Sequence, residues 1–213
     1  MPSRCACCGS PGPPLCEPCG AALEPVLAPL CTRCGAPTVW PVERCIECAG
    51  RRLAFASARA AVHYAGPAKA VVRAWKERGV RPLAALAADL VVAHVPRPAA
   101  DVITYIPPDG DRSRRRGHQP AAGLARELAL RWDLPAARLL TRVRRVGRQT
   151  GLPLEERRRN IRGAFGAVGR VHGTVVLVDD VYTTGATVTA ASSALSAAGA
   201  RAVHVVTFAR TIR

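Results

Sequence analysis

The sequence predicts an α/β domain with a mostly parallel sheet flanked by helices, preceded by a small cysteine-rich module. Three observations lead to this fold class. All nine cysteines lie before residue 49, and eight of them form four C-x-x-C pairs. After Ala58, short β-type runs alternate with longer helical runs, as in parallel strands joined by helices. The clearest strand, Thr174–Val178, has only β-branched or apolar residues, which is typical of a central parallel strand.

The length and composition allow one medium domain and one small module. The chain has 213 residues, of which 49% are hydrophobic and 4% aromatic, so the core must consist mainly of Ala, Val and Leu. We expect residues 1–52 to form the cysteine module and residues 58–213 the α/β domain. The longest apolar stretch, 83–95, contains Asp89 and is shorter than the roughly 20 residues of a membrane span. Without a secretory signal at the start, a cytoplasmic protein is expected.

Positive charge is concentrated in one part of the chain. The formal net charge is +16, and the segment 112–170 contributes +12 of it, with 16 Arg against four acids. Arginine makes planar, two-pronged contacts with phosphate. The segment therefore indicates a polyanionic partner, either nucleic acid or a multiply phosphorylated small ligand. The alternative is a solvated surface in a chain that is rich in Arg throughout.

The cysteine pairs indicate a metal-binding module. They are Cys5/Cys8, Cys16/Cys19, Cys31/Cys34 and Cys45/Cys48, with Cys7 left over. Each C-x-x-C turn brings two thiolates together, and two turns complete the tetrahedral sulfur shell that Zn²⁺ prefers. Disulfides would need an oxidising compartment, and a thioredoxin-like site would need one pair rather than four. An iron–sulfur cluster would fit the same spacing.

We expect two zinc sites in this module. Sequential pairing would place the first two C-x-x-C pairs in one site and the last two in the other, as in tandem zinc ribbons. A cross-braced pairing is the alternative. A segment this short buries too little surface to fold without its metal. Up to Arg52 it has five Arg and four Glu, which makes it a weak candidate for the main DNA contact.

The elements of the α/β domain follow from periodicity and from the positions of Pro and Gly. Proline near the start of a run and glycine after its end mark helix boundaries. The predicted strands are Arg59–Tyr64, Val102–Ile106, Thr174–Val178 and Ala202–Phe208, and the predicted helices are Pro67–Arg78, Leu83–Ala93, Pro120–Trp132 and Thr187–Ala198.

The segment between strand 174–178 and helix 187–198 is the best candidate for a ligand site. Ligands of open α/β sheets bind just beyond the carboxyl ends of the strands. Asp179 and Asp180 can accept hydrogen bonds from the vicinal hydroxyls of a ribose. The Thr- and Gly-rich turn that follows offers hydroxyls, amides and the positive end of a helix dipole to a phosphate. A plain strand exit with a helix cap is the alternative.

With these residues, the segment Val176–Thr187 resembles the signature of the type I phosphoribosyltransferases that binds 5-phosphoribosyl 1-pyrophosphate (PRPP). The resemblance implies that Asp179 and Asp180 are the catalytic pair at the ribose hydroxyls, and that Mg²⁺ bridges pyrophosphate and ribose oxygens. The residues that it implies around PRPP are Val181, Tyr182, Thr183, Thr184, Gly185, Ala186 and Thr187.

Together with the cysteine pairs, further segments resemble the ComF/GntX family of competence-associated, phosphoribosyltransferase-like proteins over essentially the whole chain. His118 departs from the family pattern, in which an aromatic residue and an Asn precede the Gln. The family implies work on incoming single-stranded DNA alongside a helicase-like partner. The matching residues are 64–66, Lys76, 106–107, 112–119, Arg142, Gln149, 156–160 and 163–165.

The loop after strand 102–106 is a second candidate site. It opens with two prolines and carries Arg112, Arg115 and Arg116 before the next helix. In the resembled fold this loop holds the pyrophosphate, whose charge suits guanidinium groups. An exposed basic loop is the alternative. Lys76 is a weaker ligand candidate, because a lysine near a helix end is usually solvated.

Two functions are consistent with these features. We favour a protein that binds PRPP or a related ribose phosphate and acts with single-stranded DNA in DNA uptake. Because aromatic residues are few, DNA contacts should involve the backbone rather than stacked bases. The alternative is an active phosphoribosyltransferase that uses PRPP and Mg²⁺ on an unidentified acceptor, unconnected with DNA. The sequence shows no element for recognising a base, and Asp180 is the one general base that it suggests.

Overall fold

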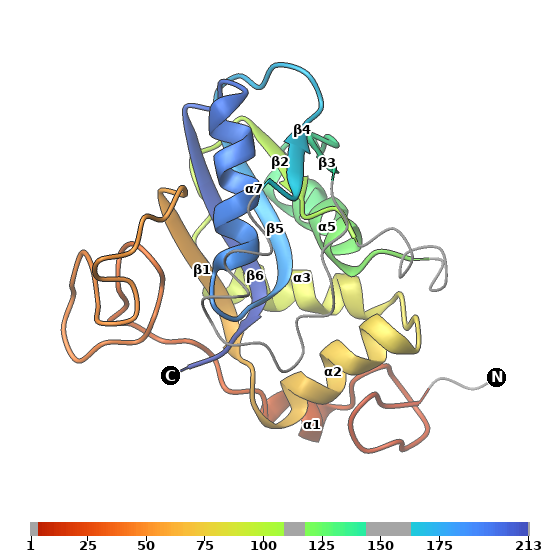
Figure 1. The fold of residues 1–213 in the computed structure, drawn as a ribbon. Helices are drawn as coiled ribbons and strands as arrows, with labels where there is room; N and C mark the ends of the chain where they lie inside the picture. The colour runs from red at the N-terminus through yellow and green to blue at the C-terminus, as the bar shows by residue number, and fades with distance from the viewer. Residues whose placement is uncertain (1–3, 109–117, 144–162, 213) are drawn as a thin grey trace.

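A four-stranded parallel sheet lies at the centre of the molecule (Figure 1). The computed structural model describes residues 4–108, 118–143 and 163–212. The strand order is β1-β6-β5-β2, and every neighbouring pair is parallel. These strands are β1 (Ser57–His63), β2 (Val102–Tyr105), β5 (Thr174–Tyr182) and β6 (Ala202–Arg210). The predicted fold class, a parallel sheet flanked by helices, is confirmed.

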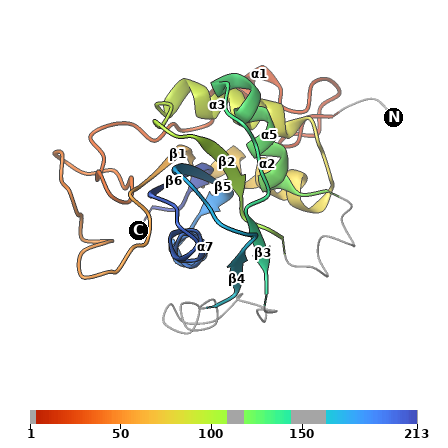
Figure 2. The same ribbon diagram turned by 90° about the horizontal axis from the view of Figure 1, so that it is seen from above.

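Helices cover both faces of this sheet. Helices α2, α3 and α5 lie on one face together with the short α1, and α7 lies on the other (Figure 2). The helices are α1 (Glu17–Ala21), α2 (Gly66–Glu77), α3 (Leu83–His94), α5 (Pro120–Trp132) and α7 (Ala186–Ala197). The four long helices begin and end within one residue of their predicted bounds, and each begins beside a Pro or a Gly. Among the described residues, no helix has the length and apolar character needed to cross a membrane.

The sheet separates two hydrophobic clusters. Val176 and Val178 pack on the side of α2, α3 and α5, whereas Val175 and Leu177 pack on the side of α7. This alternation is expected, because successive side chains of a strand point to opposite faces. Trp75 is among the largest fully buried side chains and meets the ring of Phe208 edge-on at 6.5 Å.

The strands differ from the prediction in three respects, the first of which is that β1 begins at Ser57 instead of Arg59. β5 continues to Tyr182 instead of ending at Val178, because β6 also continues and pairs with it as far as Arg210. A second, two-stranded antiparallel sheet consists of β3 (Leu140–Arg142) and β4 (Phe165–Ala167). Strands of three residues are too short to produce a recognisable alternation in the sequence.

The cysteine-rich segment passes along the edge strand β1 and reaches both clusters. Its first part packs with α2 and α3, and its second part packs on the side of α7. Between them, Val26 N donates to Ala61 O at 2.9 Å, and His63 N donates to Glu24 O at 2.8 Å. In Figure 1 the red part lies beside α2 and the orange part beyond β1. The boundary between residues 52 and 58 stays a prediction, and these contacts cross it.

Candidate functional site

The candidate site lies where the carboxyl ends of the parallel strands meet. β5 carries Asp179 and Asp180 near its end, and α7 begins immediately after Gly185. β2 ends beside the two aspartates: directly after this strand, Ile106 N donates to Val178 O at 2.9 Å. Three predicted site segments therefore converge here: the Asp pair, the Thr- and Gly-rich loop and the start of the loop after β2.

The two aspartates have different surroundings. They leave β5 on opposite faces, as neighbours on a strand do. Asp180 faces α2, where its Oδ1 lies 2.7 Å from Lys76 Nζ. Asp179 Oδ1 accepts a hydrogen bond from the amide of Asp180 at 2.9 Å. Lys76, the weaker candidate in the sequence, thus forms an ion pair with Asp180 of the predicted PRPP-binding segment.

The electrostatics of this pair depend on burial. Burial and the neighbouring Asp180 raise the pKa of Asp179 to about 7 from 3.8, although Lys76 and Arg142 act against the shift. Burial lowers the pKa of Lys76, but the two aspartates outweigh it and raise the pKa. The folded protein holds the Asp179 proton more tightly than the unfolded chain does. Without ligand, the stability contributed by Asp179 therefore falls as the pH rises from about 4 to about 7.

Gly185 shapes the loop between β5 and α7. Its φ is +72°, which favours glycine, and it directly precedes the first residue of the helix. A Cβ atom at this position would lie 2.3 Å from the hydroxyl oxygen of Tyr182. The amide of Ala186 donates to Thr184 Oγ1 at 3.2 Å. The loop thus turns tightly at the amino end of α7, where amides and the helix dipole attract anions.

Replacing Gly185 by alanine is expected to destabilise the protein by about 2 kcal/mol or more, because left-handed backbone costs about 1–2 kcal/mol in a residue with a Cβ and the clash with Tyr182 adds to it. Gly169→Ala is the matched control, since Gly169 has φ +76° but nothing within 4 Å of the added Cβ. Urea denaturation of both variants measures the difference. Equal losses in the two variants would contradict the importance of the Tyr182 contact.

Three charged residues near the loop were missed in the sequence. Arg210 Nη1 donates to Cys34 O at 2.7 Å, and its Nη2 lies 3.1 Å from Glu47 Oε2. The same guanidinium lies over the ring of Tyr182, 5.2 Å from its centroid. Arg51 donates to the carbonyl of Thr184. No sequence signal connects these residues, because they are brought together only by the fold.

The eight paired cysteines form two groups of four. Within each group the sulfur atoms lie within 4.8 Å of one another. Sequential pairing is therefore found, rather than a cross-braced arrangement. The first tetrad is Cys5, Cys8, Cys16 and Cys19, and the second tetrad is Cys31, Cys34, Cys45 and Cys48.

The tetrads suit a metal that binds thiolate. Burial raises the pKa of Cys5, but amides including that of Cys16 outweigh it and lower the pKa to about 5. In the second tetrad the same balance lowers the pKa of Cys31 to about 7. Amide hydrogen bonds to sulfur thus stabilise one thiolate in each tetrad. Four sulfurs that include a thiolate stabilised in this way match the ligand set of a structural zinc site.

The predicted pyrophosphate residues Arg112, Arg115 and Arg116 lie outside the described residues. The structure describes the residue that follows their loop: His118 has a hydrogen bond between its Nε2 and the backbone oxygen of Trp75. His118 lines a cavity of about 390 Å³. The other residues around this cavity are Trp75, Arg81, Ala84, Gln119, Gly123, Arg126 and Glu127.

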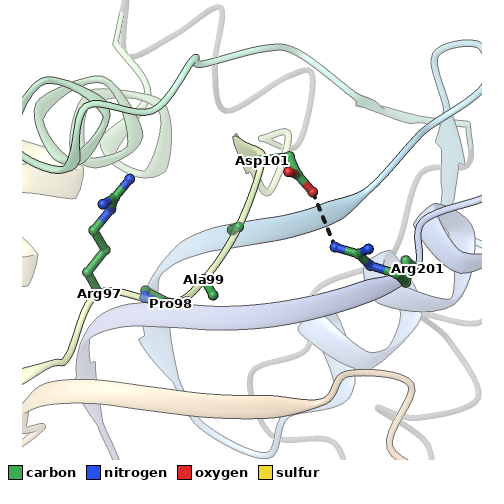
Figure 3. A pocket seen from close by; sticks show the side chains of 6 residues that line it. Arg97, Pro98, Ala99, Asp101 and Arg201 are labelled. Atoms are coloured by element: carbon green, nitrogen blue, oxygen red, sulfur yellow. Dashed lines mark ion pairs between the residues drawn. The ribbon is translucent and has the colours of Figure 1, made fainter.

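A second hollow lies at the amino ends of the strands, where β2 and β5 begin, on the opposite side from the candidate site. Its volume is about 480 Å³, and Figure 3 shows Asp101 and Arg201 facing each other beside it. Their Oδ2 and Nη2 atoms are 3.7 Å apart. Asp101 Oδ2 also accepts the amide of Thr174 at 2.7 Å. Because ligands of such sheets bind at the carboxyl ends of the strands, this hollow is not the candidate site.

Comparison with known proteins identifies a domain and several relatives. A model of the phosphoribosyl transferase domain matches residues 114–212. DNA utilization protein YhgH of Salmonella typhi is 30% identical over 210 residues, which cover 93% of this chain and 91% of that protein. Competence protein F of Haemophilus influenzae is 28% identical over 195 residues, 85% of each chain. The solved glutamine PRPP amidotransferase of B. subtilis is 29% identical over 59% of this chain and 25% of its own, with a TM-score of 0.39.

Proposed function

The chain belongs to the ComF family of competence-associated proteins with a phosphoribosyl transferase domain, and from this premise we propose that it binds PRPP or a related ribose phosphate. One observation carries the proposal. Asp179 and Asp180 lie near the carboxyl end of β5, and this strand leads into a tight loop at the amino end of α7. This arrangement supports a ligand with vicinal hydroxyls at one end and a phosphate at the other.

Each end of the ligand has suitable partners. The carboxylates of Asp179 and Asp180 would accept the 2′ and 3′ hydroxyls of the ribose. The 5′-phosphate would lie against residues 183–187, where amides meet the helix dipole. Lys76 would move its charge from Asp180 toward the bound anion. Mg²⁺ would accompany the pyrophosphate, since oxygen ligands of this kind suit it.

Calorimetric titration with PRPP, in the presence and absence of Mg²⁺, tests the proposal. We expect binding that is saturable, stronger with Mg²⁺ and competed by ribose 5-phosphate. Inorganic phosphate at the same concentration is the control for general anion binding, because it lacks the hydroxyls that Asp179 and Asp180 would bind. No heat of binding with PRPP under either condition would contradict the proposal.

We also propose that the protein acts with single-stranded DNA. The names of the relatives, DNA utilization protein and Competence protein F, support this role. So does the formal net charge of +16, part of which comes from exposed arginines such as Arg126, Arg138 and Arg170. Contacts with phosphates should lose affinity steeply as salt rises. Fluorescence anisotropy with labelled oligonucleotides at several salt concentrations measures this, and an affinity that is insensitive to salt would contradict it.

Catalysis is the second candidate function, and one observation favours it. The raised pKa of Asp179, about 7, would let its carboxylate accept a proton near neutral pH. The acceptor of the phosphoribosyl group is not identified by any described residue. Release of pyrophosphate from PRPP, measured with and without free nucleobases, distinguishes a transferase from a binding protein. Binding without release supports the first function alone.

We propose that each tetrad holds one Zn²⁺. A chelator is expected to remove the metal from the first tetrad well before the second. Cys8 is exposed and Cys16 half-buried, whereas Cys31, Cys34 and Cys48 are buried. Metal release followed with a colorimetric zinc indicator should show two phases of equal amplitude and two Zn²⁺ per chain. A single phase would contradict the expected order.

A further inference from the structure

The loop after β5 is attached to the second tetrad by one side chain. Arg51 donates from Nη1 to the carbonyl of Glu47 at 3.1 Å and from Nη2 to the carbonyl of Thr184. Glu47 lies between Cys45 and Cys48, and Arg51 N donates to Cys48 O at 3.2 Å. Arg51 therefore joins the backbone of the tetrad to the backbone of the loop.

Tyr182, which directly precedes the loop, is also held in place by residues that contact the second tetrad. Tyr182 is buried and lies edge-on to Phe55, with ring centroids 6.3 Å apart. Arg210, which covers its ring, donates to Cys34 O at 2.7 Å. Gly185 lies against the hydroxyl of Tyr182. Contacts to the second tetrad thus hold the loop both at Thr184 and through the residue that precedes it.

The contact between Arg51 and Thr184 also orients a peptide group. The carbonyl of Thr184 and the N–H of Gly185 belong to one planar peptide unit and point in opposite directions. When Arg51 binds the carbonyl, the N–H is directed away from Arg51 and from the tetrad. Both of these Arg51 donors are occupied by protein carbonyls, so the guanidinium is better suited to position the loop than to bind a phosphate itself.

We propose that Arg51 is a positioning residue that ties the phosphate loop, residues 183–187, to the second tetrad. In this way the tetrad sets the conformation in which the loop receives a 5′-phosphate. The identity of the ligand rests on the function proposed above, whereas the positioning of the loop does not. The first tetrad has no such contact with the loop among the described residues; it contacts the end of α2, where Nη2 of the capping residue Arg78 donates to Ala6 O at 2.9 Å.

The test compares Arg51→Ala with Arg51→Lys and with Arg52→Ala, which removes the same charge from an exposed neighbour. Hydrogen exchange of the amides of residues 183–187 reports on the loop without ligand, and titration with ribose 5-phosphate reports on affinity. In Arg51→Ala we expect exchange about tenfold faster in the loop and affinity about tenfold weaker, as for one lost hydrogen bond. Arg52→Ala should match the wild type, and Arg51→Lys should recover part of both losses.

The two readouts separate the two proposals. Faster loop exchange in Arg51→Ala, with no binding of ribose 5-phosphate by the wild type, would overturn the proposed function and support the positioning role. Binding by the wild type with both readouts unchanged in Arg51→Ala would overturn the positioning role. Faster exchange throughout β5 would also overturn it, because Arg51 would then support the fold as a whole. Neither binding nor a change in exchange would overturn both.

Discussion

Replacing Asp179 and Asp180 together by asparagine is expected to weaken the binding of PRPP in the presence of Mg²⁺ at least about 100-fold. A hydrogen bond to a charged acceptor contributes about 1.5–3 kcal/mol, so two of them amount to a factor of roughly 100 or more. Asparagine keeps the shape of each side chain but removes its charge and one acceptor oxygen. Isothermal titration calorimetry of the double variant beside the wild type measures the effect.

The stability of the variants shows whether lost binding reflects the site or the fold. Because burial opposes the ionisation of Asp179 and raises its pKa to about 7, Asp179→Asn should raise the Tm of the free protein at pH 8. Asp89→Asn removes one carboxylate from the exposed surface of α3 and should leave PRPP binding unchanged. A double variant that still binds PRPP as tightly as the wild type would exclude Asp179 and Asp180 from the site.

Replacing Glu47 by alanine is expected to lower the free energy of unfolding by about 3 kcal/mol, the usual cost of leaving one partner of a buried ion pair uncompensated. The side chain of Arg210 is 1% exposed, and Glu47 is the carboxylate that pairs with it at 3.1 Å. Without Glu47, the buried guanidinium would retain the carbonyl of Cys34 and the ring of Tyr182 among its described contacts. Urea denaturation at constant zinc concentration measures the loss.

Two further variants show whether this loss of stability comes from leaving the buried charge of Arg210 without its carboxylate partner. Glu43→Ala removes an exposed glutamate of the same segment and should change stability by less than about 0.5 kcal/mol. The double variant Glu47→Met/Arg210→Met removes both charges and should be more stable than Glu47→Ala alone. A double variant less stable than Glu47→Ala would show that the arginine acts through its packing on Tyr182 rather than through its charge.

The fold was predictable where local patterns are strong. Helix α5 has its predicted bounds because Pro120 begins a regular amphipathic run that ends at Trp132. The end of β5 was not predictable, since Asp179 and Asp180 are poor strand formers and their pairing depends on how far β6 extends. Likewise, β3 and β4 are defined by their mutual pairing, which no short segment encodes alone.

The candidate site was predictable to the extent that it is continuous in sequence. Residues 179–187 form one strand end and one helix start, so their types and order indicated a sugar-phosphate ligand. Lys76 was undervalued because its partner, Asp180, lies on another element. Arg51 and Arg210 were missed for the same reason: Arg51 contacts a residue 133 positions away, and Arg210 contacts one 176 positions away.

That separation between Cys34 and Arg210 has a consequence for synthesis of the chain. The second tetrad leaves the ribosome early, but the side chain that covers its backbone belongs to β6, which is made last. Pairings between such distant segments carry a large loop-closure cost and form slowly. If the tetrad takes up the proposed Zn²⁺ during synthesis, it would hold the ion before the side chain of Arg210 covers its backbone. Competition with chelators should be sharpest during translation, before β6 completes the sheet and closes over it.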